Sequence, residues 1–437
     1  MNQNKKRRII WTALALISFS GNVFCQTFLV DKNYPLDKEE EMKFFQMTED
    51  EAKAYESDLW RKIADLALIP PKINTSPSAK YDYEQQSYVM ALTNEITPKG
   101  RHWVAWIGND DGATAILLAA KSDDDGKTWS KPCIVIDAHI SDFPIGPGFP
   151  VGRSVIIGNF WTDPMGRLWL FFDQTMNHHD GRGGLWVSIC DNPDADIPVW
   201  SAPKRIWHGA MLNKPTVLSS GEWLLSAYLI QHWHRGGSVF SELEPYRGVN
   251  LLVSNDQGKT WTIRSVQKFP TPDWHEPMIV EKQNGQLWML TRSRTGILET
   301  FSDDKGYTWT EPVPSQKFKH PNSRFFFRKL ASGRILFIKN GIQLNEHEGR
   351  NQLSAWLSDD DGLTWKGGLI IDDRLRLTYP DGTQAPDGTI YVTYDHNRGN
   401  GEIVMAKFTE EDVLAGKIVS PHAQLQMVVC KPGKNQK

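Results

Sequence analysis

The sequence lacks any excess of basic residues and has little cysteine. Its 49 Lys and Arg residues are balanced by 52 Asp and Glu residues, whereas a nucleic-acid-binding protein usually carries a basic excess. Beyond residue 25 the cysteines are Cys133, Cys190 and Cys430. They are odd in number and far apart, so they predict neither a disulfide framework nor a zinc site. We expect no metal and no cofactor.

Long apolar runs are also missing, apart from one short run at the N-terminus. Four basic residues, 5–8, precede the segment IIWTALALISFSGNVF, which is too short and wrongly flanked for a membrane span. This pattern predicts a signal peptide over residues 1–25, cleaved near Cys25–Gln26, and a secreted or periplasmic protein. The alternative is a lipoprotein acylated at Cys25, but Asn-Val-Phe replaces the small residues expected before that cysteine.

Residues 36–68 contain neither glycine nor proline and are acidic with helical apolar spacing. Pro70 and Pro71 end this pattern. We therefore expect an N-terminal helical extension over residues 26–78, followed by a separate domain over residues 79–437.

The second domain has the sequence pattern of an all-β protein, with short apolar runs bounded by Gly, Asp, Asn and Pro. A turn carrying glycine and followed by an apolar strand recurs at intervals of 48 to 66 residues. The turn glycines are Gly100, Gly166, Gly221, Gly285, Gly333 and Gly388. Six copies at this spacing predict a β-propeller of six four-stranded blades.

A second repeat has the pattern S-x-D-x-G-x-T-W. Its four copies occupy residues 122–129, 254–261, 302–309 and 358–365. Four equivalent copies around a ring cannot all converge on one substrate, and a calcium loop needs more oxygen ligands. We interpret the octet as a turn that the Asp and hydroxyl groups tie together. The blades around Gly166 and Gly221 are predicted to lack it.

Four such octets on a six-bladed pattern resemble the sialidase (neuraminidase) superfamily, over about residues 80–420. The resemblance implies an exo-acting glycoside hydrolase. It also implies a site with three arginines for a carboxylate, a tyrosine nucleophile paired with a glutamate, and an aspartate acid/base. A neutral phenol avoids the repulsion that a carboxylate nucleophile would meet at a carboxylate-bearing anomeric centre.

Three segments carry this resemblance to individual residues. The resemblance implies that Glu276 is the glutamate and Arg292 the second arginine, both in the segment HEPMIVEKQNGQLWMLTRS. It implies that Arg350, in RNQLSAWLSDDDGLTW, is the third arginine. It implies that Tyr379, in LTYPDGTQAPDGTIYVTYD, is the nucleophile. Each residue also has a structural interpretation: a hairpin salt bridge for Glu276 with Arg292, a solvated strand entry for Arg350, and a buried strand position for Tyr379.

The first blade departs from the family. Its segment QQSYVMALTNEITPKG contains no arginine, so the first arginine of the triad is missing there, and Arg153 and Arg294 are candidates to replace it. The loop WIGNDDGAT would supply the acid/base as Asp110 or Asp111, although a solvated turn is the alternative. The missing arginine leaves the identity of the sugar open.

Further polar residues are candidates to contact substrate. His178 and His179 lie in DQTMNHHDGRGGLW, whose glycines indicate a loop, and Lys214 precedes the third glycine hairpin. His396 and Arg398, in YDHNRGNGE, are further candidates to face the central channel.

Two other functions stay open beside the hydrolase. A propeller polysaccharide lyase would use His and Tyr to abstract a proton beside a uronate, and a non-catalytic propeller would only bind glycans. In each case the expected partner is a glycan or oligosaccharide, and we expect a monomer.

Overall fold

The computed structural model describes residues 65–112, 114–139, 153–176, 182–229, 240–270, 273–399 and 401–433. The predicted signal peptide and most of the predicted helical extension lie outside these ranges. The described part of the extension holds one short 3-10 turn, η2 (Leu66–Leu68), and an isolated bridge from Asn74 to Val135. Among the described residues, no helix combines the length and apolarity needed to cross a bilayer.

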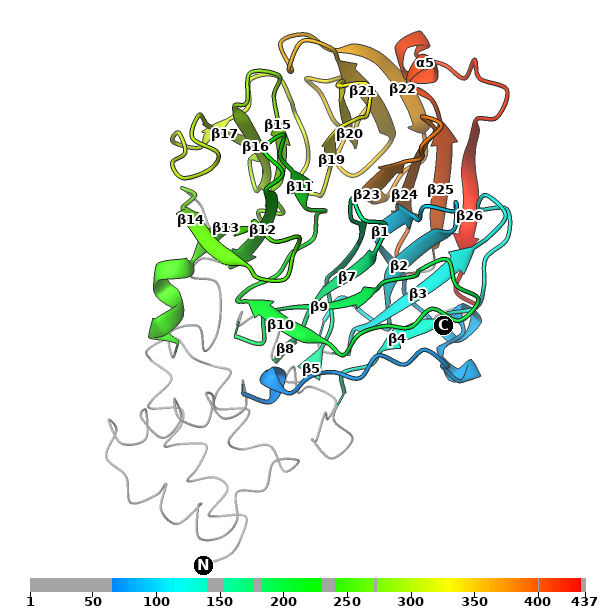
Figure 1. Cartoon of the computed structure of the whole chain (residues 1–437). Helices are drawn as coiled ribbons and strands as arrows, with labels where there is room; N and C mark the ends of the chain where they lie inside the picture. The colour runs from blue at the N-terminus through cyan, green and yellow to red at the C-terminus, as the bar shows by residue number, and fades with distance from the viewer. Residues whose placement is uncertain are drawn as a thin grey trace, which may run out of the picture.

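Six four-stranded antiparallel sheets are arranged in a ring, in the order in which they occur in the chain (Figure 1). This confirms the predicted six-bladed propeller. Blade 1 contains β1 (Met90–Ile96), β2 (His102–Gly108), β3 (Ile116–Ser122) and β4 (Ile134–Ile136). Blade 2 contains β6 (Gly158–Thr162), β7 (Leu168–Asp173), β9 (Leu185–Cys190) and β10 (Lys204–Trp207). Blade 3 contains β11 (Thr216–Val217), β12 (Trp223–Leu229), β13 (Gly248–Ser254) and β14 (Thr262–Gln267).

The second half of the chain repeats the same plan. Blade 4 contains β15 (Met278–Glu281), β16 (Leu287–Ser293), β17 (Gly296–Ser302) and β18 (Val313–Pro314). Blade 5 contains β19 (Phe326–Lys329), β20 (Ile335–Asn340), β21 (Leu353–Ser358) and β22 (Lys366–Asp372). Blade 6 contains β23 (Leu377–Gln384), β24 (Ile390–His396), β25 (Glu402–Phe408) and β26 (Gln424–Cys430).

A few elements lie outside the blades' strands. The pair β5 (Arg153–Ser154) and β8 (Thr175–Met176) forms a separate two-stranded sheet. Single helical elements are η3 (Ala79–Tyr81), η4 (Tyr83–Gln85), η6 (Ser241–Tyr246) and α5 (Glu410–Ala415). The first strands of neighbouring blades contact one another, β1 with both β6 and β23 and β15 with β19, so the first strand of each blade faces the ring axis.

The glycine turns lie where they were predicted, between the first and second strand of every blade. All six glycines have φ between 81° and 90°. This left-handed conformation is readily open to glycine but costly for residues with a Cβ. The six glycines therefore mark the blades correctly.

The four octets connect the third and fourth strands of blades 1, 3, 4 and 5. The prediction that the blade around Gly221 lacks an octet was wrong, because Ser254 ends β13 of that same blade. Blades 2 and 6 are the two without one. The spacing of 132 residues between Ser122 and Ser254 (254 − 122) spans two blades, because only blade 2 lies between these octets.

Inside each octet the hydrogen bonds follow one scheme. In blade 4, Ser302 Oγ donates to Asp304 Oδ1 at 2.8 Å, and Thr308 donates to the same carboxylate through its amide at 2.8 Å and its hydroxyl at 2.6 Å. These hydrogen bonds, those from Thr308 first, lower the pKa of Asp304 to about 2. The interpretation of the octet as a structural turn agrees with this scheme.

The octet glycines also pack against the preceding blade. A Cβ on Gly306 or Gly362 would collide with Leu251 or Trp288, which belong to blades 3 and 4. Gly126 of blade 1 lies against Met405 of blade 6 in the same way. Each described blade takes its four strands from one continuous segment, so none of these blades combines strands from both ends of the chain. The packing of the blade 1 octet on blade 6 therefore helps to close the ring.

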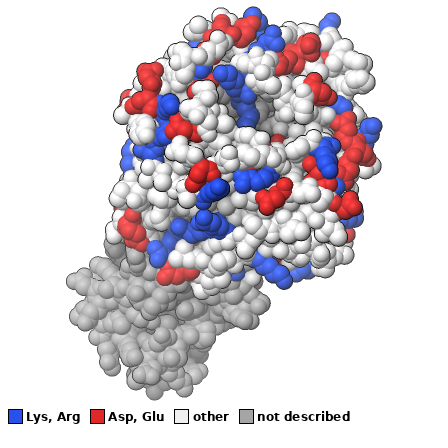
Figure 2. Space-filling model, in the orientation of Figure 1, with Lys and Arg blue, Asp and Glu red and all other residues white. Residues whose placement is uncertain are grey.

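Apolar side chains fill the space between neighbouring blades. Between blades 2 and 3, for example, Trp161, Trp169 and Trp223 pack into one buried cluster. Lys and Arg side chains lie among Asp and Glu side chains on the face seen in Figure 2, and neither sign covers that face alone. This mixture agrees with the formal net charge of −3.

Candidate active site

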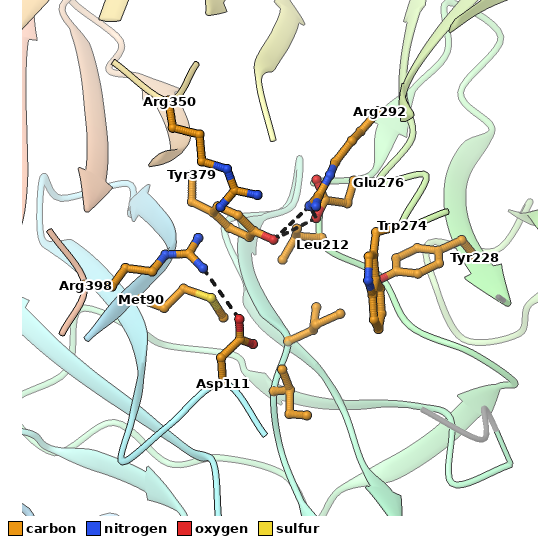
Figure 3. Close-up of a pocket in the computed structure, with 12 residues that line it drawn as sticks. Met90, Asp111, Leu212, Tyr228, Trp274, Glu276, Arg292, Arg350, Tyr379 and Arg398 are labelled. Carbon is orange, nitrogen blue, oxygen red and sulfur yellow. Dashed lines mark hydrogen bonds and ion pairs between the residues drawn. The ribbon is translucent and has the colours of Figure 1, made fainter. Parts of the chain in front are cut away.

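A pocket gathers residues from all six blades or their connecting segments (Figure 3). Its polar and charged side chains are Asp111, Tyr228, Glu276, Arg292, Arg350, Tyr379 and Arg398. Its apolar side chains are Met90, Ile156, Ile157, Leu212 and Trp274. Glu276, Arg292, Arg350 and Tyr379, which the resemblance singled out in separate segments, are therefore brought together.

Glu276 and Arg292 meet because of backbone pairing. Glu276 lies two residues before β15, and Arg292 lies near the end of β16, the strand that pairs with β15. The Arg292 amide donates to His275 O at 2.8 Å, which places the neighbouring Glu276 side chain beside the guanidinium. Arg292 Nη1 donates to Glu276 Oε1 at 2.6 Å, and both side chains are nearly fully buried.

Tyr379 completes this group from blade 6. Its hydroxyl lies 3.0 Å from Glu276 Oε1 and accepts a hydrogen bond from Arg292 Nη1 at 3.0 Å. Figure 3 shows the phenol directed toward these two side chains. The other carboxylate oxygen, Glu276 Oε2, is buried and accepts no hydrogen bond from the described residues.

The environment keeps the phenol protonated at neutral pH. Burial raises the pKa of Tyr379, the negative charge of Glu276 raises it further, and Arg292 and Arg398 oppose both effects. Burial would lower the pKa of Arg292, but Glu276 and Tyr379 outweigh it and raise that pKa above its ordinary value. The phenol can therefore donate its proton to a carboxylate held in place by a permanent cation.

Two more arginines face the same space. In the described part of the chain Arg350 forms no ion pair, and its Nη2 donates to Asn322 O at 2.7 Å. Asn322 also fixes Arg292, since its Oδ1 accepts from Arg292 Nε at 2.5 Å. Burial and the nearby Arg398 lower the pKa of Arg350. Three cations around one pocket repel each other, and a bound anion would relieve that repulsion.

Arg398 belongs to the turn between β24 and β25, at the junction of blades 6 and 1. Its carbonyl oxygen accepts from the Val89 amide at 3.1 Å, just before β1. Its Nε contacts the buried Asp395 at 3.3 Å, and its guanidinium lies 4.2 Å from the centre of the Tyr379 ring. Arg398 of blade 6 is thus the third arginine of the pocket and lies on its side next to blade 1, whose first strand, β1, contains no arginine.

The two candidates for the acid/base lie in different surroundings. Asp111 lines the pocket, with a half-exposed side chain whose Oδ2 lies 3.6 Å from Arg398 Nη1. Asp110 does not line it, because its carboxylate turns back toward Gly112 of the same loop. Of the two, only Asp111 can meet a ligand in this pocket.

The structure places the remaining predicted residues elsewhere. Arg153 donates to the carbonyl oxygens of Ala138 and Leu66 at 2.6 and 3.2 Å. Arg294 is exposed in the β16–β17 turn. Neither lines the pocket, so the structure does not bring either of them to the position expected for the missing first-blade arginine.

Lys214 is buried and does not line the pocket either. Its Nζ forms ion pairs with Asp381 at 2.9 Å and Glu95 at 3.2 Å. Three backbone or hydroxyl oxygens and two carboxylates already surround the ammonium group, so the structure does not bring Lys214 into the pocket as the sequence predicted. His178 and His179 lie outside the described residues.

The apolar half of the pocket was not predicted from the sequence. In Figure 3 Trp274 lies across the pocket from Arg350 and Arg398, on the same side as Arg292, with the Tyr228 ring edge-on to it at 5.9 Å. Trp274 is two residues from Glu276, so the segment DWHEP held a usable signal. Ile156 and Ile157 had no such signal, since they look like any buried aliphatic pair. Together these side chains offer an apolar surface to the C–H face of a sugar or to an apolar substituent.

Within the described ranges, no three His, Cys, Asp or Glu side chains converge as they would around a metal ion. The described pocket residues offer two phenols, two carboxylates and three guanidinium groups.

The sequence model of one protein family, described as "BNR repeat-like domain", matches residues 101–392. The chain belongs to this family, as a BNR propeller of the sialidase superfamily. A sialidase of Clostridium perfringens is 24% identical over 320 residues, which cover 67% of this chain and 79% of the relative. A sialidase of Paraclostridium sordellii is 24% identical over 222 residues, which cover 47% of this chain and 52% of the relative. The match thus spans about half of the second relative's length.

Solved structures share the fold of this BNR propeller. An intramolecular trans-sialidase from Ruminococcus gnavus, in complex with oseltamivir carboxylate, superposes with a TM-score of 0.59 at 15% identity, over 78% of this chain and 98% of that one. The NanB sialidase from Streptococcus pneumoniae gives a TM-score of 0.56 at 16% identity, over 79% of this chain and 71% of that one. At these identities the likeness concerns the fold alone.

Proposed function

We propose that this BNR propeller is a secreted or periplasmic exo-acting glycoside hydrolase that removes a terminal acidic sugar of the sialic acid type from glycans. One observation carries the proposal: Tyr379, Glu276 and Arg292 lie within 2.6 to 3.0 Å of each other in a pocket that also holds Arg350 and Arg398. A phenol beside a buried carboxylate is the nucleophile suited to an anomeric centre that bears a carboxylate.

The arginines would bind the substrate carboxylate. Guanidinium groups match a carboxylate in charge and in planar geometry, and Arg350 and Arg398 offer N–H groups to the pocket. The Nη2 atom of Arg398 is buried and donates to no described residue. A carboxylate bound there would compete with Asp111 for the same guanidinium, which leaves Asp111 free to serve the leaving group.

The reaction would proceed in two steps. Tyr379 attacks the anomeric carbon and passes its proton to Glu276, while Asp111 protonates the leaving glycosidic oxygen. Water then attacks the tyrosyl–sugar bond, with Asp111 taking the proton of that water and Glu276 returning a proton to the phenol oxygen. The sugar is released with its original anomeric configuration because two displacements occur at the same carbon.

A release assay tests the proposal. The wild-type protein would be incubated with sialylated, other ulosonic-acid, rhamnosylated and uronate glycans, and the products identified by mass. We expect a free ulosonic acid from the wild type and a loss of about 100-fold or more in kcat for Tyr379→Phe and for Glu276→Gln. An unsaturated product absorbing in the ultraviolet would establish a lyase instead. Binding without any product would leave a glycan-binding propeller, and full activity in both variants would refute the assigned roles.

A further inference from the structure

Glu276 and Tyr379 both adopt an unfavourable backbone conformation. Their φ angles are 42° and 58°, and each residue is followed by a proline, Pro277 or Pro380. A positive φ is uncommon for residues with bulky side chains, and a following proline restricts the preceding residue further. Such strain persists only where the surroundings impose it, so buried contacts must hold both residues in place.

On the Glu276 side, the holding contact comes from Asn213 in the segment before β11. Asn213 Nδ2 donates to Glu276 O at 2.8 Å and to Pro277 O at 3.1 Å. The side chain is 5% exposed. One amide group therefore fixes the carbonyl oxygens of Glu276 and Pro277, directly after the positive φ of Glu276.

On the Tyr379 side, the holding contact is Asp381, two residues along β23. The pairing of β23 with β24 shifts between Thr378 and Asp381, so Tyr379 lies in a bulge without a regular ladder partner. Asp381 is 1% exposed, and its Oδ2 accepts from the Asn94 amide of β1 at 3.1 Å. This carboxylate fixes the end of the bulge to blade 1.

A single buried arginine joins these two contacts. Arg324, just before β19, donates through Nε to Asn213 Oδ1 at 2.9 Å and through Nη2 to Asp381 Oδ1 at 2.8 Å. Its other bonds go to Leu92 O at 2.5 Å and Leu212 O at 2.9 Å. The side chain is fully buried and does not line the pocket.

We propose that Arg324 is a positioning residue: through Asn213 and Asp381, it holds Glu276 and Tyr379 at the hydrogen-bonding distance that the proposed reaction requires. The inference rests on the proposed function for the roles of those two residues. A planar guanidinium spans both partners at once, whereas a lysine ammonium group reaches only one of them with good geometry.

The alternative is that Arg324 only fills and stabilises the channel, together with the neighbouring Lys214–Asp381 ion pair. A matched control separates the two roles. Arg264, on the outer strand β14, is also nearly buried, donates to Glu222 Oε1 at 2.5 Å and to Lys305 O at 2.9 Å, and is remote from the pocket. Arg264→Lys therefore removes a comparable set of guanidinium hydrogen bonds without changing any contact of Glu276 or Tyr379.

The test compares Arg324→Lys with Arg264→Lys in the full chain. For Arg324→Lys we expect kcat to fall about 10- to 100-fold, as small misplacements of reacting groups do, with KM changed less than about threefold because the three pocket arginines remain. For Arg264→Lys we expect a lower melting temperature and unchanged kcat. Asn213→Ala should lower kcat by a factor similar to that of Arg324→Lys, and combining these two should add little, since both break one chain of contacts.

A second readout does not depend on turnover. The Tyr379 phenol can be titrated by NMR of 13C-labelled tyrosine, with its signal assigned by its loss in Tyr379→Phe. In Arg324→Lys, or in Asn213→Ala if that variant fails to fold, we expect the phenol pKa to fall below the wild-type value, because Glu276 no longer lies against the hydroxyl. If wild-type protein turns over no substrate, the proposed function fails and this titration alone decides the inference. An Arg324→Lys variant that loses stability but keeps both kcat and the Tyr379 titration would overturn it.

Discussion

Replacing Arg398 tests whether a blade 6 residue supplies the arginine that blade 1 lacks. The substitution Arg398→Met removes the guanidinium that would hold the substrate carboxylate but keeps much of the apolar stem. A hydrogen bond to a charged group contributes about 1.5–3 kcal/mol, and about 1.4 kcal/mol corresponds to a factor of ten. We therefore expect KM for a sialoside to rise about 10- to 100-fold.

The same change would leave Asp395 buried without its cation, and breaking such a pair destabilises a fold by about 3–5 kcal/mol. Asp395→Asn should be combined with it. An amide can still accept from the Ala91 amide and donate to the Thr378 hydroxyl, which contact Asp395 in addition to Arg398. KM would be measured for a sialoside and for the same sialoside with its carboxylate converted to a carboxamide. The reasoning is refuted if the double variant raises KM by the same factor for both substrates, or if it raises KM for neither.

Two further predictions concern the blades. Gly362→Ala should destabilise the protein by about 1–3 kcal/mol more than Gly333→Ala. Both glycines have positive φ, but a Cβ at Gly362 would collide with Trp288, whereas one at Gly333 would meet open space. Urea unfolding of the two variants measures the difference, and equal losses of unfolding free energy would contradict the packing of octets on the preceding blade. Octet carboxylates such as Asp304 have a folded-state pKa of about 2, below the ordinary 3.8. Their contribution to stability is therefore complete above about pH 4 and is lost as the pH falls toward 2. The urea midpoint of Asp304→Asn should depend less on pH in this window than that of the wild type, and identical pH curves would show that the octet hydrogen bonds do not stabilise the fold.

The architecture was predictable from the sequence because the propeller repeats local signals. Each glycine turn needs a left-handed residue, so one position per blade can be recognised without any tertiary information. The helix α5 also has local signals, since Thr409 and Asp412 form a capping box and Gly416 ends it in the left-handed conformation.

The site was predictable only in part. Glu276, Arg292, Arg350 and Tyr379 lie in segments that resemble the family, and the structure brings them together. The role of Arg398 depends on ring closure, which places a blade 6 turn beside Val89 and Met90 of blade 1, and no spacing along the chain reports that proximity. Arg324 had no signal for the same reason: its partners Asn213 and Asp381 are 111 and 57 residues away.

The most direct test of the central claim is to find where the sugar becomes attached. A substrate analogue with fluorine beside the anomeric carbon and a good leaving group slows the second displacement, so the covalent intermediate accumulates. The account predicts a mass increase of one sugar on the peptide that contains Tyr379, absent in Tyr379→Phe. An adduct on Glu276, or turnover of natural substrate without any adduct on Tyr379, would contradict it.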